Sequence, residues 1–289
     1  MQEEKTLPTN KAPRPSAVSL LASLDITANR CKPILVTPPR LIQFLRHKPT
    51  LAHPQNIIPS MEIMSTNEIL DYLKSLTAVS SNVICVCFTH AKRLGSKWLE
   101  DTNEKTNPEE IDIFTCTSLM KSLYLYTHAP LQFDHALLIK DVQILRTSPS
   151  AEIKSDQGKM KMMLLAKQEP KQNINMIYKQ MVFALEVLSN LHADAHVVIF
   201  LPPERSSASA ILHIRKALYK FCELPGYNRK PKLVFVCRTA FPTAQFMELK
   251  RTLDDINQLS QWGSFNASST TVYPYSTNIR VVKPKKKKK

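Results

Sequence analysis

Glycine is scarce in this chain of 289 residues, which contains only Gly95, Gly158, Gly226 and Gly263. An average composition of about 7% glycine would give roughly 20. Loops that bring the backbone close to a phosphate or a nucleotide depend on glycine, because a side chain would occupy the space that the ligand needs. The sequence therefore predicts that no typical glycine-rich nucleotide-binding loop is present.

Long apolar runs are also missing, as is the cysteine spacing of a disulfide framework. No apolar run approaches the roughly 18 residues of a membrane-spanning helix, so we expect no membrane partner. The first 19 residues are polar and give no sign of a secretory leader. The six cysteines are widely spread, which favours a reducing, intracellular location in the nucleus or the cytoplasm.

Positive charge is abundant, with a formal net charge of +15. The last seven residues supply six of these charges, which leaves about +9 on the rest of the chain. Such a surplus favours polyanionic partners. The candidate nucleic-acid contacts are Arg215, Lys216, Lys285, Lys286, Lys287, Lys288 and Lys289. The alternatives are a nuclear address or a solubilising end for the lysine tail, and an ordinary solvated helix face for Arg215 and Lys216.

The distribution of proline and lysine divides the chain into three parts. Residues 1–60 contain eight prolines and form a partly ordered N-terminal arm. Residues 61–282 have regular apolar patterns and form an α/β domain, and residues 283–289 are a basic tail.

Apolar periodicity predicts alternating strands and helices after residue 61. We expect strands over 82–88, 111–116, 135–141, 196–201 and 232–237, and helices over 66–76, 118–126, 174–191, 207–222 and 242–259. Residues 147–172 are polar and are predicted to form a surface loop with some helix. This alternation is typical of a mostly parallel sheet with helices on both faces, which binds ligands at the carboxyl ends of its strands.

Three segments of the second half resemble the FtsJ-type methyltransferases, in particular a divergent fungal branch. They are "KDVQILR" at 140–146, "KQMVFALEVLSNLHADAHVVIFLPP" at 179–203 and "YNRKPKLVFVCRTAF" at 227–241. Their order and spacing agree with that family over about 110 residues. The resemblance implies a Rossmann-like fold and S-adenosylmethionine as the cofactor.

The same resemblance assigns site residues and shows what is missing. Phe88, Gly95 and Cys116 are candidates for the cofactor pocket, and Asp141 aligns with the catalytic aspartate of the family. The family's glycine-rich loop would fall within 83–99, where only Gly95 is a glycine and no acidic residue ends the strand. We therefore interpret Asp141 as a relic of lost catalysis, or as an ordinary polar residue that closes a strand.

Three functions follow from this interpretation. The first is an FtsJ-like protein with lost or weak catalysis and no cofactor, which contacts RNA or an RNA-bound protein. The second is an active RNA 2'-O-methyltransferase that uses S-adenosylmethionine through an unusual loop. The third is a non-enzymatic scaffold that binds a protein partner, and fold alone does not choose among them.

Two groups of residues have side chains that can bind a metal ion, but their spacing is not typical of a metal site. Cys85 and Cys87 face the same side of their predicted strand, with no second pair at ligand spacing. His192 and His196 flank Asp194 at a strand entry, where a solvated loop is the simpler interpretation. We therefore expect buried cysteines and no metal site.

Overall fold

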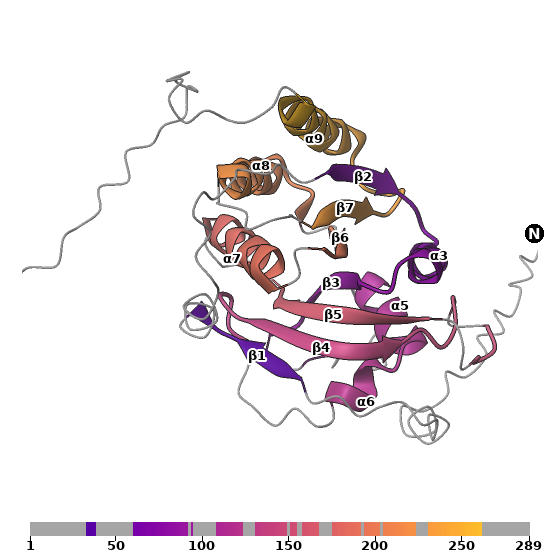
Figure 1. Cartoon of the computed structure of the whole chain (residues 1–289). Coiled ribbons are helices and arrows are strands. Elements are labelled where there is room, and N and C mark those ends of the chain that lie inside the picture. The colour runs from indigo at the N-terminus through magenta and orange to yellow at the C-terminus, as the bar shows by residue number, and fades with distance from the viewer. Residues whose placement is uncertain are drawn as a thin grey trace, which may run out of the picture.

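A mixed seven-stranded sheet forms the centre of the described part of the chain in a computed structural model (Figure 1). The structure describes residues 33–38, 60–91, 94, 108–123, 131–148, 151–154, 158–167, 175–191, 194–202, 205–223 and 231–261. The strands are β1 (Ile34–Val36), β2 (Met61–Ser65), β3 (Val83–Thr89), β4 (Ala136–Gln143), β5 (Lys159–Ala166), β6 (His196–Phe200) and β7 (Lys232–Cys237). Their spatial order is β1-β4-β5-β3-β6-β7-β2.

Strand directions are mixed because β4 runs against both of its neighbours. β2, β7, β6, β3 and β5 pair in parallel, whereas β4 is antiparallel to β5 and to β1. The α/β class is therefore confirmed, but the Rossmann-like methyltransferase sheet is not what the chain forms. β1 comes from the proline-containing arm and pairs with β4 through Ile34 and Leu138.

Helices cover both faces of the sheet (Figure 1). They are α3 (Ile69–Val79), α5 (Pro108–Cys116), α6 (Leu119–Leu123), α7 (Asn175–Leu191), α8 (Ala208–Glu223) and α9 (Thr243–Gln261). Apolar side chains of α7, α8 and α9 form one core with one face of the sheet, and those of α3, α5 and α6 form a second core with the other. No described helix is long and apolar enough to cross a membrane.

Two elements differ from the sequence prediction. Residues 111–116 belong to helix α5 and not to a strand. Pro108, Glu109 and Glu110 open this helix, as proline and acidic residues commonly do, and this signal outweighs the apolar run that follows. The stretch 147–172, predicted as a surface loop, contains β5 between β3 and β4.

The burial pattern of β5 explains why its sequence did not predict a strand. Its first residues alternate between lysine and methionine, and its last five residues are all buried. The Lys161 ammonium group remains satisfied because it donates to Asn82 Oδ1 over 2.8 Å at the amino edge of the sheet. The strand thus begins polar and ends in the core, which gives no clean period of two.

Candidate functional site at the carboxyl edge of the sheet

The carboxyl ends of β3, β5 and β6 meet at one edge of the sheet, where the connections diverge. After β3 the chain passes to α5 on one face, whereas after β5 and β6 it passes to α7 and α8 on the other. Open α/β sheets bind ligands outside the carboxyl ends of strands at such a point of divergence. We call the residues Thr89, His90, Glu110, Lys167 and Arg205 at this edge the carboxyl-edge site.

Glu110 supplies a buried carboxyl group to this site. Its side chain is 2% exposed, and Oε1 accepts hydrogen bonds from Thr89 Oγ1 over 2.6 Å and from the His90 backbone N–H over 3.4 Å. Its Oε2 atom is buried and has no hydrogen-bond partner among the described residues. A buried acceptor without a partner costs stability, and in a native protein such an atom calls for an explanation.

Burial also changes the pKa of Glu110. Loss of solvation raises the pKa of this carboxyl above its ordinary value near 4.5, while its two hydrogen bonds and the positive charges of Lys167 and His90 act in the opposite direction. The side chain of His90 adds a second polar atom to the site, since its Nδ1 atom is buried without a hydrogen-bond partner in the described residues. A carboxyl group whose pKa is raised in this way keeps its proton to a higher pH than an ordinary glutamate does.

Arg205 places a buried cation at the end of β6. The residue is 2% exposed, its guanidinium lies 4.1 Å above the ring of Phe88, and Nη2 donates to Oε1 of Gln180. Gln180 on α7 in turn donates to the Ala166 carbonyl at the end of β5 over 2.9 Å. The guanidinium is therefore held in one position between the ends of β3, β5 and β6.

The start of α8 lies next to Arg205 in the sequence and carries an N-terminal cap. Ser207 Oγ accepts from the Ala210 N–H over 3.2 Å, and the Ser207 carbonyl accepts from the Ile211 N–H over 3.0 Å. The N-terminus of a helix has a partial positive charge and attracts anions. Together with Arg205, it makes this part of the edge favourable for a phosphate group.

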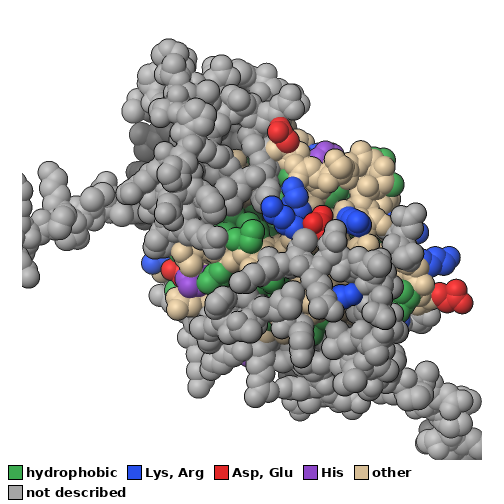
Figure 2. Space-filling view, turned by 60° about the horizontal axis from the view of Figure 1, so that its bottom comes forward, with side chains coloured by type: hydrophobic (Ala, Val, Ile, Leu, Met, Phe, Trp, Pro, Cys, Tyr) green, Lys and Arg blue, Asp and Glu red, His purple; other side chains and the backbone are tan. Residues whose placement is uncertain are grey.

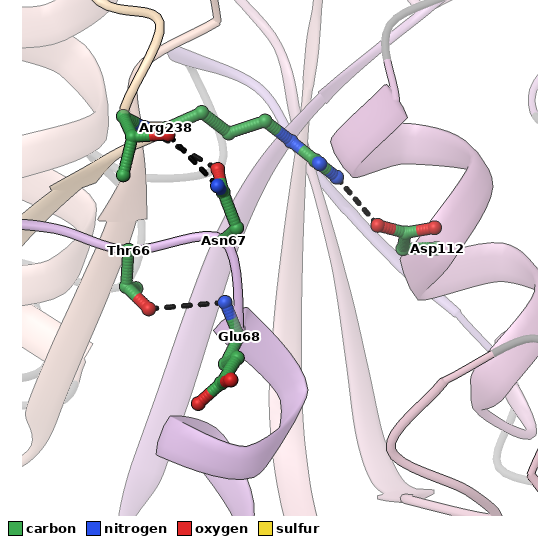
Figure 3. A network of polar contacts seen from close by, with 6 residues as sticks. Thr66, Asn67, Glu68, Asp112 and Arg238 are labelled. Atoms are coloured by element: carbon green, nitrogen blue, oxygen red, sulfur yellow. Dashed lines mark hydrogen bonds and ion pairs between the residues drawn. The ribbon is translucent and has the colours of Figure 1, made fainter.

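A second group of polar residues joins the ends of β2 and β7 to α5 (Figure 3). Arg238 Nη2 and Asp112 Oδ2 form an ion pair at 2.5 Å. Asn67 donates to Thr239 Oγ1 over 2.8 Å and accepts from the Thr239 N–H over 3.3 Å. These contacts attach α5, which carries Glu110, to the far side of the same edge.

Of the predicted pocket residues, the structure describes Phe88 and Cys116 and places them in different cores. Phe88 lies in the core beneath α7 and α8, and Cys116 lies in the other core, on the opposite face of the sheet. Burial raises the pKa of the Cys116 thiol to about 12, so it remains neutral. Gly95 lies outside the described residues.

Asp141 lies away from the carboxyl edge. It sits on antiparallel β4 at a bulge, and the next residue, Val142, pairs with Met160 near the start of β5. Its backbone has φ 53°, and its side chain is exposed. Because β4 runs in the opposite direction, the end of this strand reaches the amino edge of the parallel strands.

The remaining predicted residues form no shared site in the described structure. Arg215 Nη1 pairs with Glu248 Oε1 at 2.6 Å, and Lys216 is exposed. On the described part of the face in Figure 2, basic side chains are interspersed with acidic ones. The lysine tail and His192 lie outside the described residues. Cys85 and Cys87 are buried in the core as predicted, and the described residues contain no group of three or more potential metal ligands.

Sequence reasoning missed Glu110, Arg205 and Arg238. The proline and two glutamates at 108–110 carried a helix-start signal that would have placed Glu110 at the edge of the sheet. Arg205 precedes two serines that follow the strand over 196–200, which is a similar signal for the start of α8. The pairing of Arg238 with Asp112 joins residues that are 126 positions apart, so no local pattern indicates it.

The chain has a mixed α/β sheet with helices on both faces, and solved structures with the same fold are known. The chain is similar to poly(ADP-ribose) glycohydrolase from Deinococcus radiodurans in complex with ADP-ribose, with a TM-score of 0.56 and 16% identity over 77% of this chain and 94% of that one. It is also similar to the Thermomonospora curvata poly(ADP-ribose) glycohydrolase bound to the inhibitor ADP-HPD, with a TM-score of 0.54 and 14% identity over 76% and 84%. No protein-family model and no curated protein matches the sequence.

These similarities overturn the resemblance to FtsJ-type methyltransferases. The fold is that of the glycohydrolases, so the prediction of an FtsJ-like RNA methyltransferase-related protein, with or without catalysis, is wrong. Where the structure describes them, the matched segments at 140–146, 179–203 and 227–241 belong mainly to β4, α7, β6 and β7, which are elements of a kind that many α/β sheets share. Asp141 loses its assigned role as a catalytic relic with that resemblance.

Proposed function

We propose that this protein binds an ADP-ribosyl group at the carboxyl-edge site. The observation that carries the proposal is the buried Arg205 beside the start of α8, at the point where the connections of the sheet diverge. A fixed guanidinium and a helix N-terminus suit the two phosphates of ADP-ribose. The solved glycohydrolases that share the fold support this choice, since one is in complex with ADP-ribose.

The scarcity of glycine affects how such a ligand would be held. With only four glycines in the chain, the backbone has few positions that can approach a diphosphate closely. Arg205 offers charge from a side chain in place of bare backbone N–H groups. We therefore expect binding to depend on this single side chain more strongly than it would in a glycine-rich loop.

Calorimetric titration tests the proposal directly. ADP-ribose should bind with a dissociation constant on the order of micromolar, and S-adenosylmethionine should give no heat of binding. Arg205→Met, which keeps most of the apolar packing on Phe88, should abolish the signal. Absence of ADP-ribose binding at millimolar concentration would refute the proposed function.

A second candidate function is hydrolysis of an ADP-ribosyl bond, and Glu110 favours it. A buried carboxyl with a raised pKa can give its proton to the leaving oxygen of a glycosidic bond while water attacks the anomeric carbon. Incubation with poly(ADP-ribose) should then release ADP-ribose, and Glu110→Gln should slow the release by about 10²-fold or more. If the chain binds ADP-ribose but releases none from poly(ADP-ribose), binding of the ADP-ribosyl group remains the proposed function.

A further inference from the structure

We infer that Arg238 is a positioning residue, which holds the first half of α5, and with it the Glu110 carboxyl group, against the end of β3 through its ion pair with Asp112. The inference rests on the proposed function, because it concerns the same carboxyl-edge site. It adds a residue that directly follows β7, a strand that is separated from β3 in the sheet by β6.

Helix geometry places the two acidic residues of α5 on different sides. Glu110 and Asp112 are two positions apart, which is a rotation of about 200° around a helix with 3.6 residues per turn. Glu110 contacts Thr89 and His90 at the end of β3, while Asp112 contacts Arg238. The start of α5 is therefore held from two nearly opposite sides.

The backbone around Arg238 is itself well fixed. The Arg238 carbonyl accepts from the Phe241 N–H over 2.9 Å in a tight turn, and the preceding Cys237 carbonyl accepts from the Thr66 N–H over 3.0 Å. Asn67 makes two hydrogen bonds to Thr239, the residue that follows Arg238. The guanidinium thus extends from a rigid base toward α5 (Figure 3).

Loss of the Arg238–Asp112 ion pair would change the surroundings of the Glu110 carboxyl group. The Arg238 and Asp112 side chains are 21% and 27% exposed, whereas Glu110 is almost fully buried. Without the ion pair, the first half of α5 would lose its contact with the residue that follows β7, and water would gain access to the carboxyl group. The charged groups that act on Glu110 are Lys167 at the end of β5 and His90 at the end of β3, and neither would be altered.

The test uses a charge-neutral break of the pair, Arg238→Gln with Asp112→Asn, in the full chain. The free energy of unfolding is measured from pH 4 to pH 8 in the presence and absence of a further Glu110→Gln change, which isolates the titration of Glu110. We expect this titration to move toward the ordinary pH range of a glutamate. Arg238→Lys with Asp112 intact should restore most of the original profile.

The matched control is the ion pair of Arg215 and Glu248 on α8 and α9, which has a similar length and similar exposure. Arg215→Gln with Glu248→Gln should leave the Glu110 titration unchanged. A uniform loss of stability in the Arg238/Asp112 variant, with the Glu110 titration unmoved, would overturn the inference and leave Arg238 with a purely structural role.

Ligand binding separates this inference from the proposed function. If the wild-type chain binds ADP-ribose, the Arg238/Asp112 variant should bind it about tenfold more weakly, because the site is less well positioned. If the wild-type chain binds no ADP-ribose, the proposed function fails. The Glu110 titration still decides whether Arg238 positions the carboxyl group.

Discussion

The two edges of the sheet differ in the burial and pairing of their charged side chains. At the amino edge, Lys232 pairs with Glu62 at 2.9 Å while both side chains remain partly exposed, and Lys161 donates to Asn82. At the carboxyl edge, Glu110 is buried, and one of its oxygens has no hydrogen-bond partner among the described residues. Charges that only stabilise a fold remain near water or fully paired, because burial is costly.

This difference is one reason for placing the proposed site at the carboxyl edge. Arg146, near the amino edge, is also buried, but its Nε and Nη2 atoms both donate to the Thr115 carbonyl, at 3.2 and 3.1 Å. That contact joins the end of α5 to the chain that follows β4 and is structural. In the buried carboxyl at the other edge, Oε1 accepts two hydrogen bonds, whereas Oε2 has no hydrogen-bond partner among the described residues, which supports the proposed ligand site.

The largest effect is expected from Arg205→Ala. The change removes the cation above Phe88 and the partner of the Gln180 oxygen, so urea unfolding should show a loss of about 3 kcal/mol. Binding of ADP-ribose should disappear as well. If the variant were as stable as the wild type, the guanidinium would not be held as described.

Glu110→Gln should have an effect on stability that depends on pH. A carboxyl whose pKa is higher in the folded chain than in the unfolded chain lowers the free energy of unfolding once the pH exceeds its ordinary value near 4.5. Glutamine keeps an acceptor for Thr89 and cannot ionise. The stability of the variant relative to the wild type should therefore rise from pH 4 toward neutral pH, as measured by denaturant unfolding. A difference that is constant with pH would argue against a raised pKa.

Asp141→Gly should raise stability slightly and leave the ligand site untouched. The positive φ of 53° is unfavourable for aspartate and open to glycine, so a gain of about 0.5 kcal/mol is expected in thermal unfolding. Asp141→Val should lower stability, since a branched side chain tolerates this conformation poorly. A change in ADP-ribose affinity in the Asp141→Gly variant would contradict the division between the two edges.

The smallest effect is expected from Arg215→Gln. Its ion pair with Glu248 is partly exposed, and such pairs contribute little, so the loss should be under about 0.5 kcal/mol and should vanish at high salt. Urea unfolding at low and high ionic strength measures this difference. A larger loss that persists in salt would mean that the pair supports the packing of α8 on α9.

The sequence predicts elements well where their periodicity is long. The expected helix over 174–191 matches α7 at 175–191, and the apolar strand over 82–88 matches β3 at 83–89. Two segments, 111–116 and 159–166, were misinterpreted because α5 resembles a strand in composition and β5 begins with alternating lysines. The antiparallel direction of β4 is set by its pairing with β5, and no local sequence pattern indicates this pairing.

The candidate site was less predictable than the fold. Phe88 was selected for its place at the end of a strand, and it does lie beneath Arg205. The carboxyl and guanidinium groups of Glu110 and Arg205 meet this edge from α5 and from the start of α8, which are far apart in the chain. The sequence resemblance pointed instead to Asp141, which lies at the opposite edge.

Backbone NMR of the full chain during titration with ADP-ribose tests the account most directly. The amide signals of Thr89, His90 and Ser207 at the carboxyl edge should shift in a saturable manner, while those of Asn82 and Asp141 at the amino edge should remain in place. Shifts confined to the amino edge, or no saturable shift at millimolar ligand, would contradict the assignment of an ADP-ribosyl site to the carboxyl edge.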